Sequence, residues 1–204
     1  YTVSGLSASV TKTDAGTYTN AISGTAVVQD EAGNDVTAQF TVSKTDGSLE
    51  IAKKNVTVTV ADADDVEYDG AEHTGITTYT FDGIVDGETA TITYTAAKGT
   101  LVGTYTGTYG DDFKVVKGEE VLTDNYTLTT KTPGKLNIVD RTEKYEITLV
   151  AVSNTGNTYD GTEKTAAGVV TDKFTFNEVE YTVSNFTTSD PAEKNAGTYP
   201  NTIT

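Results

Sequence analysis

The chain has 204 residues, and 30 Asp and Glu against 14 Lys and Arg give it a formal net charge of -16 at pH 7. This charge repels phosphate backbones and anionic lipid headgroups, so we expect no nucleic-acid partner and, with no run of 18 apolar residues, no direct membrane insertion. The absence of cysteine excludes a disulfide framework and a thiol-ligated zinc site. Frequent Thr, Val and Tyr favour an all-β fold with a thin core.

The first clear strand pattern in chain order is the alternation of Val56, Val58 and Val60 with threonines, which turns one face of a strand inward. No stretch shows the 3.6-residue apolar period of a core-facing helix. About seven short strands in roughly 90 residues are typical of a β-sandwich. The other predicted strands cover residues 77–81, 89–95, 103–109, 113–116, 126–130 and 136–139.

Several motifs recur in a fixed order at a spacing of about 90 residues, which predicts internal repeats. A Tyr-Asp-Gly triplet occurs twice and a Gly-Thr-Tyr motif three times. Residues 36–42 match 122–128, and 47–51 match 134–138. The motif residues are Tyr68, Asp69 and Gly70 with Tyr159, Asp160 and Gly161 for the first motif, and Gly16 and Tyr18, Gly103 and Tyr105, and Gly197 and Tyr199 for the second.

The order of the motifs divides the chain into three segments. Residues 1–53, the N-terminal segment, are predicted to be the C-terminal part of a repeat. Residues 54–142, the middle segment, are predicted to be a complete repeat, and residues 143–204, the C-terminal segment, the N-terminal part of a further one. Because the tyrosines of the two motifs occupy equivalent places, we expect them to pack within each repeat rather than bind a ligand.

The ordered motifs Tyr-Asp-Gly, Ala-Gly-Thr-Tyr-x-Asn-x-Ile, Asn-Tyr-Thr-Leu and Gly-x-Leu-x-Ile resemble the MBG-type and YDG-type repeats of bacterial cell-surface adhesin-like proteins. The resemblance covers essentially the whole chain. It implies a secreted protein that is attached to the wall or envelope through segments outside this chain, and whose non-catalytic repeats contact neighbouring repeats and present a distal binding region.

Together these observations predict tandem immunoglobulin-like β-sandwich repeats, with β-grasp-like units as the alternative fold. The predicted role is a structural stalk. The alternative role is a module whose loops recognise a host glycan, mucin or matrix protein.

One acidic cluster has enough carboxylates to suggest a calcium site, since Ca²⁺ takes six to eight oxygen ligands. Its spacing does not match an EF-hand loop, and its second copy keeps only Asp160, so a solvated loop is the favoured interpretation. His73 is the only histidine, and no catalytic motif surrounds it, so we expect neither an enzyme nor a cofactor other than this possible Ca²⁺. The calcium candidates are Asp62, Asp64, Asp65, Glu67 and Asp69.

Overall fold

The computed structural model describes all 204 residues and is all-β, with 21 strands, two 3-10 helices and no α-helix. The chain forms two compact units. The first comprises Tyr1–Asp62, Gly75–Ala97 and Thr106–Lys135, and the second comprises Ala63–Thr74, Lys98–Tyr105 and Leu136–Thr204. No helix is long and apolar enough to cross a membrane.

The N-terminal segment contributes two antiparallel strand pairs to the first unit. Strand β1 (Thr2–Ser7) pairs with β3 (Ser23–Gln29), and β2 (Gly16–Asn20) pairs with β4 (Gly47–Ile51). The one buried hydrophobic residue of this segment is Val28, on β3.

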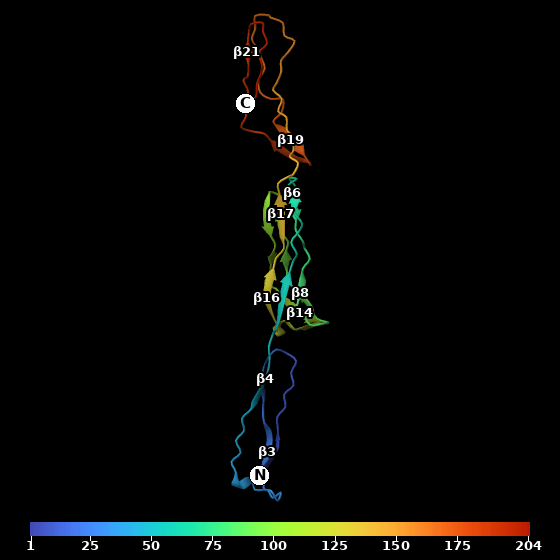
Figure 1. Cartoon of the computed structure of the whole chain (residues 1–204), viewed down its shortest axis with the longest axis vertical. Coiled ribbons are helices and arrows are strands. Elements are labelled where there is room, and N and C mark those ends of the chain that lie inside the picture. The colour runs from blue at the N-terminus through green and yellow to red at the C-terminus, as the bar shows by residue number, and fades with distance from the viewer. The chain divides into compact units, whose positions relative to one another are not determined.

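A three-stranded sheet with β5 at its centre carries the core of the first unit (Figure 1). Strand β5 (Lys54–Thr59) pairs in parallel with β16 (Tyr126–Thr132) and antiparallel with β8 (Thr80–Asp82). The remaining strands of this unit are β9 (Thr89–Thr91), β14 (Lys114–Lys117) and β15 (Glu120–Val121) in one sheet, and β10 (Tyr94–Thr95) with β13 (Thr108–Tyr109) in another.

The core confirms the alternation that the sequence predicts, because Val56, Val58 and Val60 are 0%, 0% and 3% exposed. Val56 clusters with Val115 and Tyr126. Because the intervening threonines face away, the apolar face of β5 lies entirely on one side of its sheet. Partly buried side chains of Phe81, Ile84, Ala90, Phe113, Leu122 and Leu128 complete the cluster.

The loop between β8 and β9 is held by the Tyr126 hydroxyl group. This group donates a hydrogen bond of 2.6 Å to Glu88 Oε2 and accepts one of 3.3 Å from the Val85 amide. Burial, followed by the hydrogen bond to Glu88, raises the pKa of Tyr126. Gly87 nearby has a φ of +82° and no atom within 4 Å of the place where a Cβ would lie, so the base of the loop is anchored while this position faces open space.

The second unit contains a three-stranded sheet with β17 (Lys135–Val139) between β12 (Gly103–Thr106) and β6 (Val66–Glu67). Strand β17 is parallel to β6 and buries Leu136 and Ile138, which are 1% and 2% exposed. Three short antiparallel pairs complete the unit. They are β7 (His73–Thr74) with β11 (Lys98–Gly99), β18 (Lys164–Thr165) with β21 (Ala192–Glu193), and β19 (Lys173–Phe176) with β20 (Val179–Thr182).

The strands differ from the sequence predictions in two respects. The predicted strands 89–95 and 103–109 are each divided into two short strands, the second at Gly107, where a Cβ would collide with the Tyr94 hydroxyl group. The predicted immunoglobulin-like β-sandwich consists of antiparallel sheets, whereas β5 with β16 and β6 with β17 are parallel. Parallel partners come from distant parts of the chain, so local turn residues carry no information about them.

Matched stretches of the sequence adopt the same local structure. Residues 36–42 and 122–128 each contain a 3-10 helix, Thr37–Gln39 and Thr123–Asn125. In the first, the Thr37 hydroxyl oxygen accepts a hydrogen bond of 2.8 Å from the Val28 amide. In the second, the Thr123 hydroxyl oxygen accepts one of 3.0 Å from the Val115 amide, so the same side-chain bond fixes both turns.

Candidate functional site

The first Tyr-Asp-Gly motif forms a turn that is stabilised by its aspartate. Asp69 Oδ1 accepts a hydrogen bond of 2.8 Å from the Ala71 amide and lies 2.8 Å from His73 Nε2. Gly70 has a φ of +85°, a conformation that glycine adopts without steric cost. The Ala71 amide, followed by the bond to His73, lowers the pKa of Asp69.

The second Tyr-Asp-Gly motif has the same geometry with lysine in place of histidine. Asp160 Oδ1 accepts a hydrogen bond of 2.9 Å from the Thr162 amide, and Asp160 Oδ2 lies 2.8 Å from Lys164 Nζ. Gly161 has a φ of +77°. Lys164, followed by the Thr162 hydroxyl and amide groups, holds the pKa of Asp160 far below its usual range. Both motifs therefore form turns in which the aspartate bonds a backbone amide two residues later and the side chain four residues later, His73 in the first and Lys164 in the second.

The Gly-Thr-Tyr motif folds each tyrosine ring back over its own chain. The Tyr18 hydroxyl group donates to the Asp14 carbonyl at 2.9 Å, and the Tyr105 hydroxyl group donates to the Leu101 carbonyl at 2.9 Å. Tyr199 makes no such bond and is 40% exposed. The glycine leaves room for the ring, since a Cβ on Gly197 would lie 2.8 Å from the Tyr199 hydroxyl oxygen, and one on Gly16 would lie 3.2 Å from that of Tyr18.

The acidic cluster is dispersed among separate hydrogen bonds. No group of three His, Cys, Asp or Glu side chains is arranged to hold a metal ion. Asp64 is exposed, and the structure gives its side chain no hydrogen bond or ion pair. The other carboxylates accept hydrogen bonds: Asp62 from the Lys135 amide at 2.8 Å, Asp65 from Asn137 Nδ2 at 3.0 Å, Glu67 from the Thr142 amide at 3.1 Å, and Asp69 as described above.

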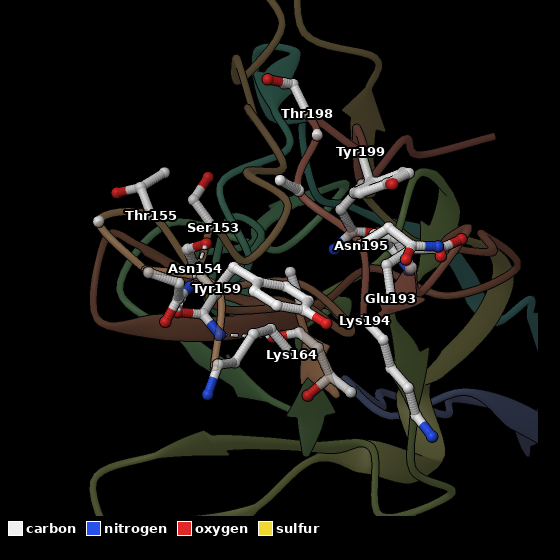
Figure 2. Close-up of a pocket in the computed structure, with 18 of the residues that line it drawn as sticks. Ser153, Asn154, Thr155, Tyr159, Lys164, Glu193, Lys194, Asn195, Thr198 and Tyr199 are labelled. Carbon is white, nitrogen blue, oxygen red and sulfur yellow. Dashed lines mark hydrogen bonds between the residues drawn. The ribbon is translucent and has the colours of Figure 1, made fainter. Parts of the chain in front are cut away.

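A polar pocket of about 600 Å³ lies in the second unit. It is lined by residues 152–159, 162, 164–166, 191 and 193–201. Figure 2 shows the rings of Tyr159 and Tyr199 beside it, with Lys164, Glu193 and Lys194 around its edge. Its walls are rich in hydroxyl, amide and backbone groups and contain no histidine or cysteine.

The side chain of Asn201, one of the residues that line this pocket, bridges two backbone carbonyls. Its Nδ2 donates to the Val152 carbonyl at 3.2 Å and to the Gly168 carbonyl at 3.0 Å. Tyr159, by contrast, is 68% exposed, although the sequence analysis predicted that it packs like its match Tyr68, whose hydroxyl oxygen is 3.3 Å from that of Tyr181. The sequence identifies the motif residues of this region but not the pocket, because the motif carries no information about which segments pack beside it.

Comparisons with protein-family models, curated proteins and solved structures find no match to this chain.

Proposed function

We propose that the chain is a non-catalytic stalk segment of an extracellular bacterial surface adhesin-like protein, which holds a distal binding region away from the cell. In this proposal the stalk is built of tandem units of about 90 residues, of which the middle segment is a complete one. Each unit is an immunoglobulin-like β-sandwich. A β-grasp-like unit is the less favoured fold, because such a unit needs a helix packed on its sheet and the chain has no α-helix.

The observation that carries this proposal is the parallel pairing of the first long strand of the middle segment with one of its last. The middle segment begins at β5. Strand β16 runs beside β5 in the same direction over six paired residues, from Tyr126 opposite Lys54 to Thr132 opposite Thr59. A force that pulls the start of β5 and the end of β16 apart acts along the strands. It loads all of their hydrogen bonds together in shear, so this arrangement resists extension better than an end that peels one bond at a time.

Matched hydrogen bonds in matched segments also support the proposal. Three kinds of hydrogen bond each occur twice, at matching positions of the sequence. They are the aspartate bond of the Tyr-Asp-Gly turn, the tyrosine bond to the carbonyl four residues earlier, and the threonine bond that fixes a 3-10 turn. Three independent local structures that recur in order are expected if one unit is copied along the chain.

Single-molecule extension of the whole chain, held at Tyr1 and Thr204, tests the stalk role. We expect one dominant force peak that releases roughly 300 Å, the extended length of about 90 residues. Thr57→Pro, which removes an amide from the centre of β5, should lower the peak force, because proline cannot donate to the ladder. Thr175→Pro in β19, outside this sheet, is the matched control and should leave the peak unchanged. A chain that extends without a distinct peak contradicts the proposal.

A further inference from the structure

The hairpin formed by β19 and β20 in the C-terminal segment has one apolar face. Phe174 pairs with Tyr181 and Phe176 pairs with Val179, and all four side chains are partly buried. The residues that alternate with them along both strands are exposed. A hairpin of two strands is only marginally stable in water, so its apolar face needs a surface to pack on.

The first Tyr-Asp-Gly turn, in the middle segment, contacts this face. The Tyr68 and Tyr181 hydroxyl oxygens are 3.3 Å apart. Their hydrogen bond, followed by burial, raises the pKa of Tyr181 to about 12. A Cβ on Gly70 would collide with the Tyr181 hydroxyl oxygen and would lie 3.0 Å from a methyl carbon of Val179. The glycine of the turn therefore leaves room for two side chains of the hairpin.

The link between the middle and C-terminal segments is longer than the matching link before it. Ile51 and Ile138 are 87 residues apart, whereas Lys54 and Tyr145 are 91 residues apart, so this link has four additional residues. Motion between two units of a chain is the usual expectation unless contacts between them prevent it. The contacts made by the link itself therefore decide whether this joint is mobile.

Arg141 and Thr142 bond the link to the strand and turn that precede it. Arg141 Nη1 donates to the Tyr68 carbonyl at 3.2 Å, and its Nε donates to the Glu143 carbonyl at 2.9 Å. The amide and hydroxyl groups of Thr142 both donate to Glu67 Oε1, at 3.1 and 2.6 Å. The additional length of the link is thus held against β6 and the turn.

The ring of Tyr145 connects the link to the hairpin. It stacks on Phe176 with the ring centres 4.4 Å apart, and the Arg141 guanidinium carbon lies 4.2 Å from the Tyr145 ring centre. A guanidinium group over an aromatic face is an attractive contact. The Tyr145 hydroxyl oxygen also accepts a hydrogen bond of 2.9 Å from Asn177 Nδ2 at the tip of the hairpin. One connected set of contacts therefore runs from the turn through the link to the hairpin.

We propose that the Tyr-Asp-Gly turn is the surface on which a repeat binds the hairpin of the next repeat, and that Arg141 and Tyr145 hold this joint in one arrangement. The partner of the turn is the following repeat of the same chain, and the apolar face of β19 and β20 is what the turn recognises. Tyr68 and Gly70 thus act between repeats as well as within a turn. This inference rests on the repeat unit of the proposed function, and it supplies a joint that does not bend.

Paramagnetic relaxation enhancement in NMR spectra of the whole chain tests the binding of the hairpin. The chain has no cysteine, so Thr175→Cys on the exposed face of the hairpin carries a single nitroxide label. We expect this label to broaden the amide signals of residues 66–72. Gly70→Ala should reduce the broadening at least twofold, because its methyl group takes the place of the Tyr181 hydroxyl group.

The matched control is Gly161→Ala in the second Tyr-Asp-Gly turn. Gly70 and Gly161 have φ of +85° and +77°, so alanine is strained at both, but a Cβ on Gly161 meets no atom within 4 Å. The control should broaden residues 66–72 as much as the labelled chain without it. Tyr181→Ala leaves the turn unaltered, so it serves as a second variant and should also reduce the broadening at least twofold.

The role of Arg141 is tested by nitrogen-15 relaxation. In the unaltered chain, we expect the amides of β19 and β20 to have the same rotational correlation time as those of β17. Arg141→Ala should shorten the correlation time of the hairpin alone, because the link is then no longer bonded to Tyr68 and Tyr145. Equal correlation times in this variant would overturn the role of Arg141.

Three outcomes would overturn the binding of the hairpin by the turn. They are a labelled chain without broadening at residues 66–72, equal losses in Gly70→Ala and Gly161→Ala, and full broadening in Tyr181→Ala. The force peak expected of the stalk depends on β5 and β16, which lie outside this joint. A failure of the joint is therefore distinguishable from a failure of the stalk role.

Discussion

Val56 and Ile147 lie 91 residues apart, like the two Tyr-Asp-Gly motifs, but they differ in burial. This difference predicts that shortening the two side chains lowers the free energy of unfolding by unequal amounts. Val56→Ala removes two methyl groups from a side chain with no exposed surface, packed against Val115 and Tyr126. At about 0.8 kcal/mol for each buried carbon, plus a term for the cavity, the unfolding free energy should fall by about 2 kcal/mol. Ile147→Val removes one carbon from a side chain that is 39% exposed and should cost about 0.5 kcal/mol or less.

The assay is urea and thermal unfolding of the whole chain at low concentration, followed by far-UV circular dichroism and tyrosine fluorescence. A loss of about 2 kcal/mol in the free energy of unfolding lowers the thermal midpoint of a unit of roughly 100 residues by roughly 8 to 16 °C. The slope of the urea transition should stay constant, since neither substitution changes the surface exposed on unfolding. Equal midpoint shifts for the two variants would refute the reasoning, because the loss of one carbon at the partly exposed Ile147 would then cost as much as the loss of two carbons at the buried Val56.

Three further results are expected from single bonds described above. Tyr105→Phe removes the bond to a backbone carbonyl and should cost about 1 kcal/mol in urea unfolding, while an unchanged midpoint would show that the bond contributes nothing. Tyr126→Phe should speed hydrogen exchange of the Val85 amide in NMR spectra, and unchanged protection would argue against the anchoring of the loop by the hydroxyl group. The carboxyl group of Asp160 should titrate below the usual 3.8, and Lys164→Ala should raise its midpoint. Because the pKa of Asp160 is lowered in the folded state, the stability that its carboxylate contributes is present above the ordinary aspartate range and is lost as the pH falls toward the lowered value. A titration midpoint of Asp160 that does not move in Lys164→Ala contradicts the ion pair.

Local features of this fold were predictable from the sequence. The alternation around Val56 reports which face is buried, because side chains along a strand alternate between its two faces. The turns at Gly70 and Gly161 were predictable because an aspartate side chain accepts a hydrogen bond from the amide two residues later and glycine adopts the positive φ that the turn requires.

Features that depend on distant partners were not predictable. The parallel partners of β5 and β17 lie far away in the sequence, and no turn residue encodes them. The exposure of Tyr159, in contrast to Tyr68, has the same origin, since the motif is identical and only the neighbouring segment differs. The carboxylates near Asp65 illustrate the limit for sites: the sequence favoured a solvated loop over a calcium site, but it did not show that four of the five carboxylates accept hydrogen bonds from separate groups.

The loop between β8 and β9 can change in sequence and length near Gly87 while its base stays fixed. Its base is fixed by the Tyr126 hydroxyl group, while Gly87 faces open space. Residues inserted next to Gly87 would meet no packed neighbour, so natural insertion or deliberate grafting can diversify the loop there, whereas substitution of Gly87 itself is strained by its φ of +82°. A peptide epitope inserted there would be displayed on a framework whose folding does not depend on it.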